Sequence, residues 1–195
     1  DYNHWRQLGN AGWASDDVLP YFKRSETQER GEDEHHGEDG PLHVSNMRVE
    51  RNICSALISA AEELGIPRND DFNGATQDGA GYYQMTAKKG RRCSTAVGYL
   101  NPVRARPNLT IITHAHAEFL LFSDTDERAV SGIQFSIKGK LKRALLKTGG
   151  EVILSSGAIG SPQILQVSGI GPGSLLQGLG IKVQHDLKGV GENLQ

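Results

Sequence analysis

The segment 151–172 constrains the fold more than any other part of the chain. It opens with the apolar run 152–154, which is the kind of sequence that a buried strand uses. Residues 155–160 are then almost all small, so that a ligand or another backbone can approach closely. The segment therefore predicts a strand followed by an open turn.

The same segment continues with the pattern of a helix. Ser161 suits the N-cap and Pro162 the first helical position. Apolar and small residues follow at helical spacing up to Ser168, and Gly169 is placed to end the helix. Ligands of α/β proteins bind where such a strand passes into a helix, so this turn is the first candidate for a binding site.

These residues also carry a resemblance to a known family. The segment resembles the second signature of the glucose–methanol–choline (GMC) oxidoreductases, which are FAD-dependent enzymes that oxidise alcohols. The matching positions are Gly157, Ala158, Ser161, Pro162, Ile164, Leu165, Ser168, Gly169, Ile170 and Gly171. The resemblance implies that Ser155, Ser156 and Gly157 lie against FAD. The alternative is a strand, turn and helix that hold no ligand.

Further landmarks of the family appear in its usual order. The basic run 88–92 by itself is typical of a solvated surface, with a nucleic-acid patch as the alternative. Its continuation is similar to a second GMC motif, with Gly90, Arg92, Ser94, Ala96, Tyr99, Leu100, Pro102, Arg106, Pro107, Asn108 and Leu109. The segment 12–22 is similar to the one that follows the lid over FAD, and 189–195 resembles the family's Val-Gly-Glu-Asn-Leu-Gln run.

Four strands are predicted between these landmarks, at 109–113, 117–122, 129–137 and 140–146. The family places this meander beside the adenine of FAD. The resemblance implies that the backbone of Ala117, where valine is more usual, contacts the adenine ring. A short helix is expected at 175–179 and a short strand at 181–183.

The N-terminal half shows fewer chemical signals. Helices are predicted from Ser15 and over 47–64, and the second should bury Ile53, Leu57, Ala60, Ala61 and Leu64. The polar segment 27–40 is expected to be a loop, either mobile or partly ordered, with His35 and His36 solvated. A strand at 79–86 would point Tyr82 and Tyr83 to opposite faces. Both are candidates for substrate contact, with packing in the core as the alternative.

The predicted fold class is mixed α/β: part of a Rossmann-like FAD-binding domain with a β-meander, together with part of a substrate-binding domain. Residues 1–44 are expected to form the helix and acidic loop after the lid, 45–100 part of the substrate domain, and 101–195 part of the FAD domain. A cut across two domains would expose apolar surface, so self-association is expected.

Composition excludes several other classes. The net charge of −2 favours neither nucleic acid nor a membrane surface, and no apolar run approaches the ~20 residues of a membrane span. Cys54 and Cys93 match no metal motif and are expected to be reduced thiols of a cytoplasmic protein. The histidines show no zinc pattern, and the acidic cluster at 70–74 lacks EF-hand spacing.

Two parts of a GMC enzyme have no counterpart in this sequence. The Gly-x-Gly-x-x-Gly unit that receives the pyrophosphate is not found, and no histidine stands in the context of the family's catalytic base. We therefore expect an internal fragment of an FAD-dependent alcohol or choline oxidoreductase, with no catalytic residue of its own, that neither retains FAD nor oxidises alcohols alone. The alternative is a free-standing, non-catalytic binding or regulatory domain. The particular alcohol and the electron acceptor stay open.

Overall fold

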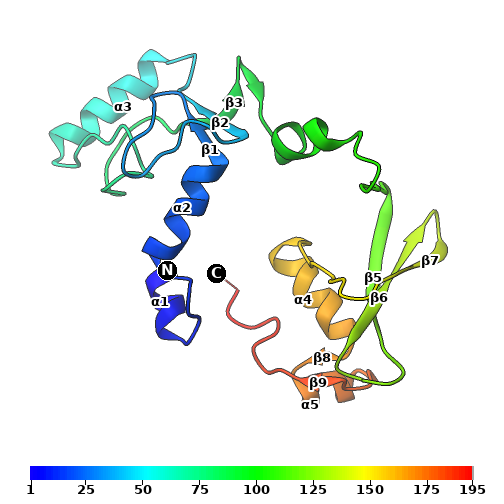
Figure 1. Cartoon of the computed structure of the whole chain (residues 1–195). Helices are drawn as coiled ribbons and strands as arrows, with labels where there is room; N and C mark the ends of the chain where they lie inside the picture. The colour runs from blue at the N-terminus through cyan, green and yellow to red at the C-terminus, as the bar shows by residue number, and fades with distance from the viewer. Residues whose placement is uncertain (195) are drawn as a thin grey trace. The chain divides into compact units, whose positions relative to one another are not determined.

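A computed structural model describes residues 1–194, and its chain divides into two compact units. The first unit is Asp1–Thr110 and the second begins at Ile111. Both combine helices with short sheets, as the mixed fold class predicts, and the elements are labelled in Figure 1.

The first unit opens with two helices, α1 (Tyr2–Gln7) and α2 (Ser15–Ser25). The helix α2 was predicted, and its start is fixed by Asp17, whose carboxylate accepts a hydrogen bond from the backbone N–H of Ala14 at 3.0 Å. The helix α1 was not predicted, and the turn-forming residues Gly9, Asn10 and Gly12 follow shortly after it. Edge-to-face packing of Trp5 on Tyr2 and Trp13 holds it in place.

A four-stranded sheet follows in the order β1 (Glu26–Gln28), β2 (Leu42–Ser45), β3 (Met85–Lys88) and β4 (Arg91–Arg92). The strands β1 and β2 pair in parallel, and the other pairs are antiparallel. Residues 29–40 form no helix or strand, as predicted, but the prediction of a solvated loop over 27–40 is wrong at its start and at His36. Its first residues join a sheet, and His36 is buried with 3% of its surface exposed.

The helix α3 (Asn52–Glu63) begins later than predicted, and the face that was predicted to be buried is exposed. Only Ile58 is buried, whereas Ile53, Leu57 and Leu64 are 74%, 71% and 83% exposed. The apolar periodicity was correct as a helix signal, but no described residue covers that stripe. The stripe therefore lies on the surface of the unit.

The segment after α3 also departs from its prediction. The strand expected over 79–86 begins only at β3, so Tyr82 and Tyr83 precede it. Ser94 accepts a hydrogen bond from the N–H of Val97 at 3.4 Å at the start of η1 (Ala96–Leu100), which runs into η2 (Asn101–Val103). No strand forms at 109–113.

The second unit contains the predicted meander, with β5 (Ala115–Phe122), β6 (Val130–Ile137) and β7 (Lys140–Leu145) in antiparallel order. The register between β5 and β6 shifts at Glu118, which is a β-bulge. The outer edge of β5 faces α4 (Gly157–Val167), as Figure 1 shows.

The rest of the second unit is built on a small parallel pair, β8 (Ile170–Gly171) with β9 (His185–Asp186). Between them lies α5 (Gly173–Gly178), whose Leu176 is fully buried. The helix was predicted, but the strand expected at 181–183 is displaced to β9. Among residues 1–194, no helix is both long enough and apolar enough to cross a membrane.

Candidate functional site

The strand predicted over 152–154, just before the turn that leads into α4, is not formed. Residues 152–154 are extended but pair with no strand in the described chain, and Ile153 is 83% exposed. An apolar strand of this type needs neighbours on both sides, and residues 1–194 provide none there. The apolar run is therefore present without the sheet that would bury it.

The helix α4 begins at Gly157 rather than at Ser161, and Ser156 is its N-cap. The Ser161 hydroxyl accepts a hydrogen bond from the backbone N–H of Ser156 at 2.9 Å, so it supports the first turn from within the helix. Pro162 lies inside α4, and because proline has no N–H, the carbonyl of Ala158 loses its usual helical partner.

The N-terminal end of α4 is open, as a ligand-facing turn requires. Gly157 has a φ of +84°, and a Cβ added there would meet no atom within 4 Å. Ser155, Ser156 and Ala158 are exposed. Small side chains and unpartnered backbone N–H groups therefore meet at the positive end of an 11-residue helix, which suits the close approach of a polar or planar group.

One side of α4 faces the C-terminal tail across a cavity of about 540 Å³, which we call the α4–tail groove. It is lined by Ala158, Ile159, Pro162, Gln163 and Gln166 of the helix and by residues 191–194. The Gln166 side chain donates a hydrogen bond to the carbonyl of Val190 at 3.0 Å, and a Cβ on Gly191 would lie 2.6 Å from the Gln166 amide nitrogen. Gly191 thus allows the tail to approach the helix.

The α4–tail groove was not predicted from the sequence. The two segments that form it, α4 and residues 191–194, each resemble a motif of one family, and this was the only sequence signal that relates them. Their spacing in the sequence does not indicate that they pack together. Glu192 is the acidic residue of the groove. Its carboxylate would repel a phosphate, so an uncharged portion of a cofactor fits this part better than a pyrophosphate.

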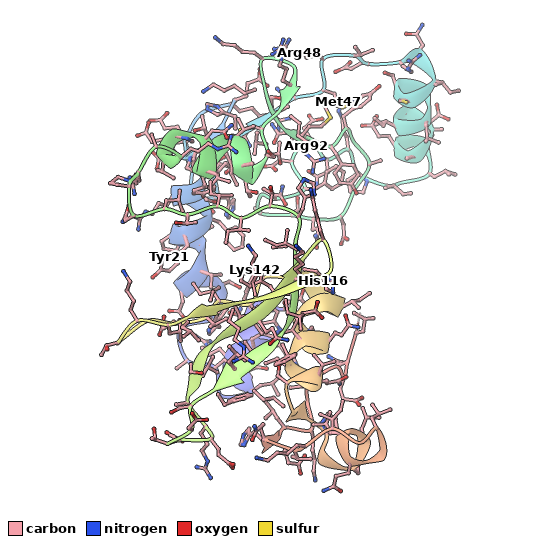
Figure 2. All side chains as sticks on the ribbon, turned by 90° about the vertical axis from the view of Figure 1, so that its right-hand side faces the viewer. Tyr21, Met47, Arg48, Arg92, His116 and Lys142 are labelled. Carbon is pink, nitrogen blue, oxygen red and sulfur yellow. The ribbon has the colours of Figure 1, made fainter. Side chains whose placement is uncertain are left out.

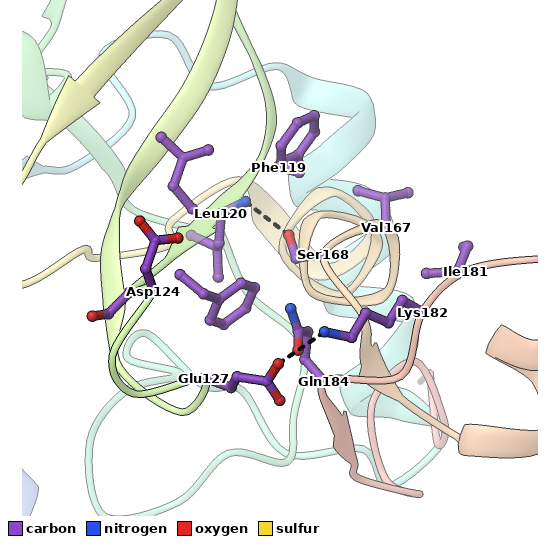
Figure 3. Close-up of a pocket in the computed structure, with 12 residues that line it drawn as sticks. Phe119, Leu120, Asp124, Glu127, Val167, Ser168, Ile181, Lys182 and Gln184 are labelled. Carbon is purple, nitrogen blue, oxygen red and sulfur yellow. Dashed lines mark hydrogen bonds and ion pairs between the residues drawn. The ribbon is translucent and has the colours of Figure 1, made fainter.

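The C-terminal end of α4 is closed. Ser168 accepts a hydrogen bond from the backbone N–H of Leu120 at 2.8 Å (Figure 3). It also donates a hydrogen bond to the carbonyl of Ile164. Gly169 then ends the helix with a φ of +89°, as predicted. Because β5 is an edge strand, Ser168 satisfies an N–H that β6 does not reach.

A separate cavity of about 470 Å³ lies at this closed end. Figure 3 shows its side chains, with Phe119 and Leu120 from β5, Val167 and Ser168 from α4, and Lys182 paired with Glu127 at 3.0 Å. It lies at the opposite end of α4 from the predicted cofactor turn.

The predicted site residues divide between the two units. The second unit holds Ala117, Ser155, Ser156 and Gly157, and the first holds Tyr82 and Tyr83. Ala117 is half-buried in β5, paired with Phe135 and followed directly by the bulge at Glu118. The packing of α4 on β5 brings the strand of Ala117 and the helix of Gly157 into one compact body.

The two tyrosines have different surroundings. The Tyr82 hydroxyl lies 3.0 Å from the Ser55 hydroxyl and 3.3 Å from the carbonyl of Arg51, both at the start of α3. Tyr83 is 71% exposed, and its ring packs on Phe72 with centroids 4.7 Å apart. Tyr82 is thus engaged within the unit, and Tyr83 presents its ring at the surface.

The imidazole of His36 is a buried titratable group of the first unit. Its Nδ1 lies 2.8 Å from the Glu26 carboxylate and its Nε2 lies 2.9 Å from the Asp71 carboxylate. Burial of the ring lowers its pKa, but the hydrogen bonds with Glu26 and Asp71 outweigh this, so the pKa of His36 is raised. Both ring nitrogens are engaged, which makes this cluster a fastening between segments rather than a free catalytic base.

His43 has the opposite shift. Burial and the neighbouring ammonium of Lys88, 2.7 Å from its Nε2, lower the pKa of His43. Within the described part of the chain, no three histidine, cysteine, aspartate or glutamate residues gather as a metal site would require.

Comparison with known proteins identifies the class to which this fold and turn belong. The profile of the GMC oxidoreductase family matches residues 1–195, and the chain belongs to that family. It is 44% identical over its whole length to the oxygen-dependent choline dehydrogenases of Paraburkholderia xenovorans and Acinetobacter baumannii. The chain spans 34% and 36% of those proteins, respectively, which is about a third of their length.

Solved structures agree with this assignment. The chain resembles pyridoxine 4-oxidase from Mesorbium loti with a TM-score of 0.84 and 28% identity, over 96% of this chain and 36% of that one. It resembles an FAD-dependent oxidoreductase from Chaetomium thermophilum with a TM-score of 0.86 and 27% identity, over 96% of this chain and 34% of that one. The predicted family and fold are therefore confirmed.

Proposed function

We propose that this chain is the part of a flavin-dependent oxidoreductase that lies along FAD, in a protein that oxidises a primary alcohol such as choline. The carrying observation is the open N-terminal end of α4, where Gly157 leaves space for a ligand beside exposed Ser155 and Ser156. Relatives named as choline dehydrogenases support an alcohol of that class.

FAD, when bound, supplies the chemistry of the reaction by accepting a hydride from the alcohol carbon. The role of this chain is to bind and orient. We propose that the backbone of Gly157 approaches FAD closely and that Ser155 and Ser156 donate hydrogen bonds to it. We propose that the backbone of Ala117 contacts FAD on its adenine side. Tyr82 and Tyr83 are assigned to the substrate side, where the exposed ring of Tyr83 is the better placed of the two.

The domain assignment follows the same proposal. We assign 1–44 to the segment after the flavin lid, 45–100 to the substrate domain and 101–195 to the FAD domain. The unpaired apolar run 152–154 supports this, because it lacks the sheet that an FAD domain would place beside it. The free thiols of Cys54 and Cys93 suit a reducing compartment, and we place the protein in the cytoplasm.

We infer further that the isolated chain neither retains FAD nor oxidises alcohols. A helix N-terminus with small residues positions part of a dinucleotide, but it does not enclose one. The chain also offers no unengaged buried base in its described residues beside the α4 turn. The exposed stripe of α3 supports self-association of the isolated chain, which sedimentation at increasing concentration would detect.

The experiment compares the 195-residue chain with the complete reading frame that encodes it. We expect the complete protein to purify with a visible flavin absorbance band that bleaches when choline or another primary alcohol is added without oxygen. We expect the isolated chain to be colourless. A complete protein without flavin, or a reading frame that ends with this chain, would instead favour a non-catalytic binding domain.

A further inference from the structure

The first unit holds a cavity to which the proposed function assigns no ligand, although Gly90 and Arg92 of its lining belong to the second GMC motif. It lies beside the turn that joins β3 to β4, has a volume of about 710 Å³, and is called the hairpin cavity below. Figure 2 shows Met47, Arg48 and Arg92 beside this hairpin. The residues on which the argument depends are Met47, Arg48, Val49, Met85, Gly90 and Arg92.

Most of the lining is apolar. Met47, Val49 and Met85 are 36%, 64% and 45% exposed, which is more than such side chains show when they fill a core. Methionine side chains are flexible and polarisable, so two of them adapt readily to the shape of an apolar ligand. This part of the cavity fits a short hydrocarbon body.

Two guanidinium groups supply the charge of the cavity. The Arg48 side chain lies over Gly90, where an added Cβ would stand 2.9 Å from its Nη1. Lys89 and Gly90 have φ values of +50° and +75° and make the two-residue turn of the hairpin, so the glycine both allows the turn and leaves room for Arg48. Arg92 joins the lining from β4, opposite Ala87.

These arginines have no counter-charge in the cavity. Among the described residues, neither Arg48 nor Arg92 pairs with a carboxylate, and the lining contains no aspartate or glutamate. Lys88, Lys89 and Arg91 stand on the same hairpin and add to the positive potential. The cavity therefore combines two positive groups with a mainly apolar surface, to which Ser45, Asn46 and Thr86 add neutral polar side chains.

We propose that the hairpin cavity binds a carboxylate that carries an apolar tail, such as a medium-chain fatty acid. Guanidinium groups bind carboxylates through paired, charge-assisted hydrogen bonds, and the methionines would cover the tail. The volume lies within the range of about 300–1,000 Å³ that small-molecule sites occupy. The site lies in the first unit, whereas the residues assigned to FAD, Ala117 and Ser155 to Gly157, lie in the second.

The direct test is calorimetric titration of the 195-residue chain with three probes that share one tail. Octanoate should bind at least about tenfold more tightly than octanol, since the latter makes no charge-assisted hydrogen bond. Octyltrimethylammonium should bind no more tightly than octanol, because the two guanidinium groups repel it. Equal affinities for the three probes would overturn the proposal.

Two further probes separate the head from the tail. Inorganic phosphate has the charge but no apolar body, so it should bind at least about tenfold more weakly than octanoate. A single-stranded oligonucleotide tests the basic run 88–92 as a nucleic-acid surface. Tighter binding of phosphate or of the oligonucleotide than of octanoate would contradict the proposal.

Variants then assign the site. The double variant Arg48→Ala/Arg92→Ala should weaken octanoate binding at least about tenfold. Arg48→Lys/Arg92→Lys keeps both charges but loses the fork geometry, and should retain part of the affinity. Arg104→Ala removes an exposed arginine that does not line the cavity and should bind as the unmodified chain does. Unchanged binding in the folded Ala or Lys double variant, judged by circular dichroism, would overturn the assignment.

Discussion

The two units use different chemistry to fasten irregular segments to their sheets. In the first unit, His36 joins Glu26 of β1 to Asp71 in a distant loop through two hydrogen bonds that involve charge. In the second, the neutral hydroxyl of Ser168 joins the end of α4 to the edge of β5. Each contact bridges parts of the chain that are far apart in sequence.

The charged contact and the neutral contact should differ in how strongly they depend on pH. A charged cluster depends on protonation, because a buried carboxylate or imidazolium without its partner is costly. A hydroxyl that donates and accepts one hydrogen bond does not titrate in the ordinary pH range. We therefore expect pH and point substitutions to act on the units separately.

The largest effect is expected at the charged cluster. His36→Ala leaves Glu26 and Asp71 without their shared partner and should lower the free energy of unfolding of the first unit by about 3 kcal/mol. Urea unfolding followed by the fluorescence of Trp5 and Trp13 reports on that unit. His35→Ala is the matched control, since the ion pair of the His35 ring in the described chain is with the exposed Glu34, and equal losses in both variants would contradict the role of His36.

The next effect compares two glycines at the ends of α4. Gly169 and Gly157 both have positive φ, but an added Cβ at Gly169 would stand 2.4 Å from the carbonyl oxygen of Lys182. Gly169→Ala should therefore destabilise the second unit by about 3 kcal/mol, from backbone strain and overpacking together. Gly157→Ala meets only the strain and should cost about 1 kcal/mol.

Hydrogen exchange of the amides in β5 and β6 measures both losses in the second unit, which contains no tryptophan. Similar protection against exchange in Gly169→Ala and Gly157→Ala would contradict the expected difference between the packed and the open end of α4.

Ser168 tests the neutral fastening itself. Ser168→Ala leaves the buried N–H of Leu120 without a partner and should cost about 2 kcal/mol. Ser161→Ala also removes a hydroxyl that accepts a backbone N–H, but at the exposed end of α4, and should cost about 0.5 to 1 kcal/mol. Exchange of the Leu120 amide should accelerate only in the first variant; an equal response in both would contradict a special role for Ser168.

The smallest effect is the pH dependence. Because the pKa of His36 is raised on folding, its contribution to stability is fully present below the unfolded pKa of about 6.5 and is lost as the pH rises through the folded pKa. The first unit should lose up to about 1.4 kcal/mol for each pH unit in that window. The slope should vanish in His36→Ala, and protection in β5 should not follow it; a parallel loss in both units would contradict the comparison.

The sequence was most informative where structure is local. The meander β5–β7 was predicted from alternating and β-branched residues, and the end of α4 from Gly169. The first turn of α4 was misplaced because Ser161 supports the N-cap from inside the helix, which no spacing rule distinguishes from capping.

Long-range partners could not be read in the same way. His36 stands in a charged, polar run that is typical of a solvated loop, and only the fold brings Asp71 to it. The buried face of α3 was assigned to its apolar stripe, but the described residues leave that stripe exposed. The α4–tail groove was missed for the same reason, since it joins two segments of the second unit across the fold.

The central claim is that the open end of α4 lies against FAD, and flavin content tests it most directly. Gly157→Trp fills that space, whereas Gly139→Trp changes another positive-φ glycine with nothing within 4 Å, in the turn between β6 and β7. In the complete reading frame, we expect Gly157→Trp to lower the FAD-to-protein absorbance ratio at least about tenfold, and Gly139→Trp to leave it unchanged. Equal flavin content in the two folded variants would contradict the account.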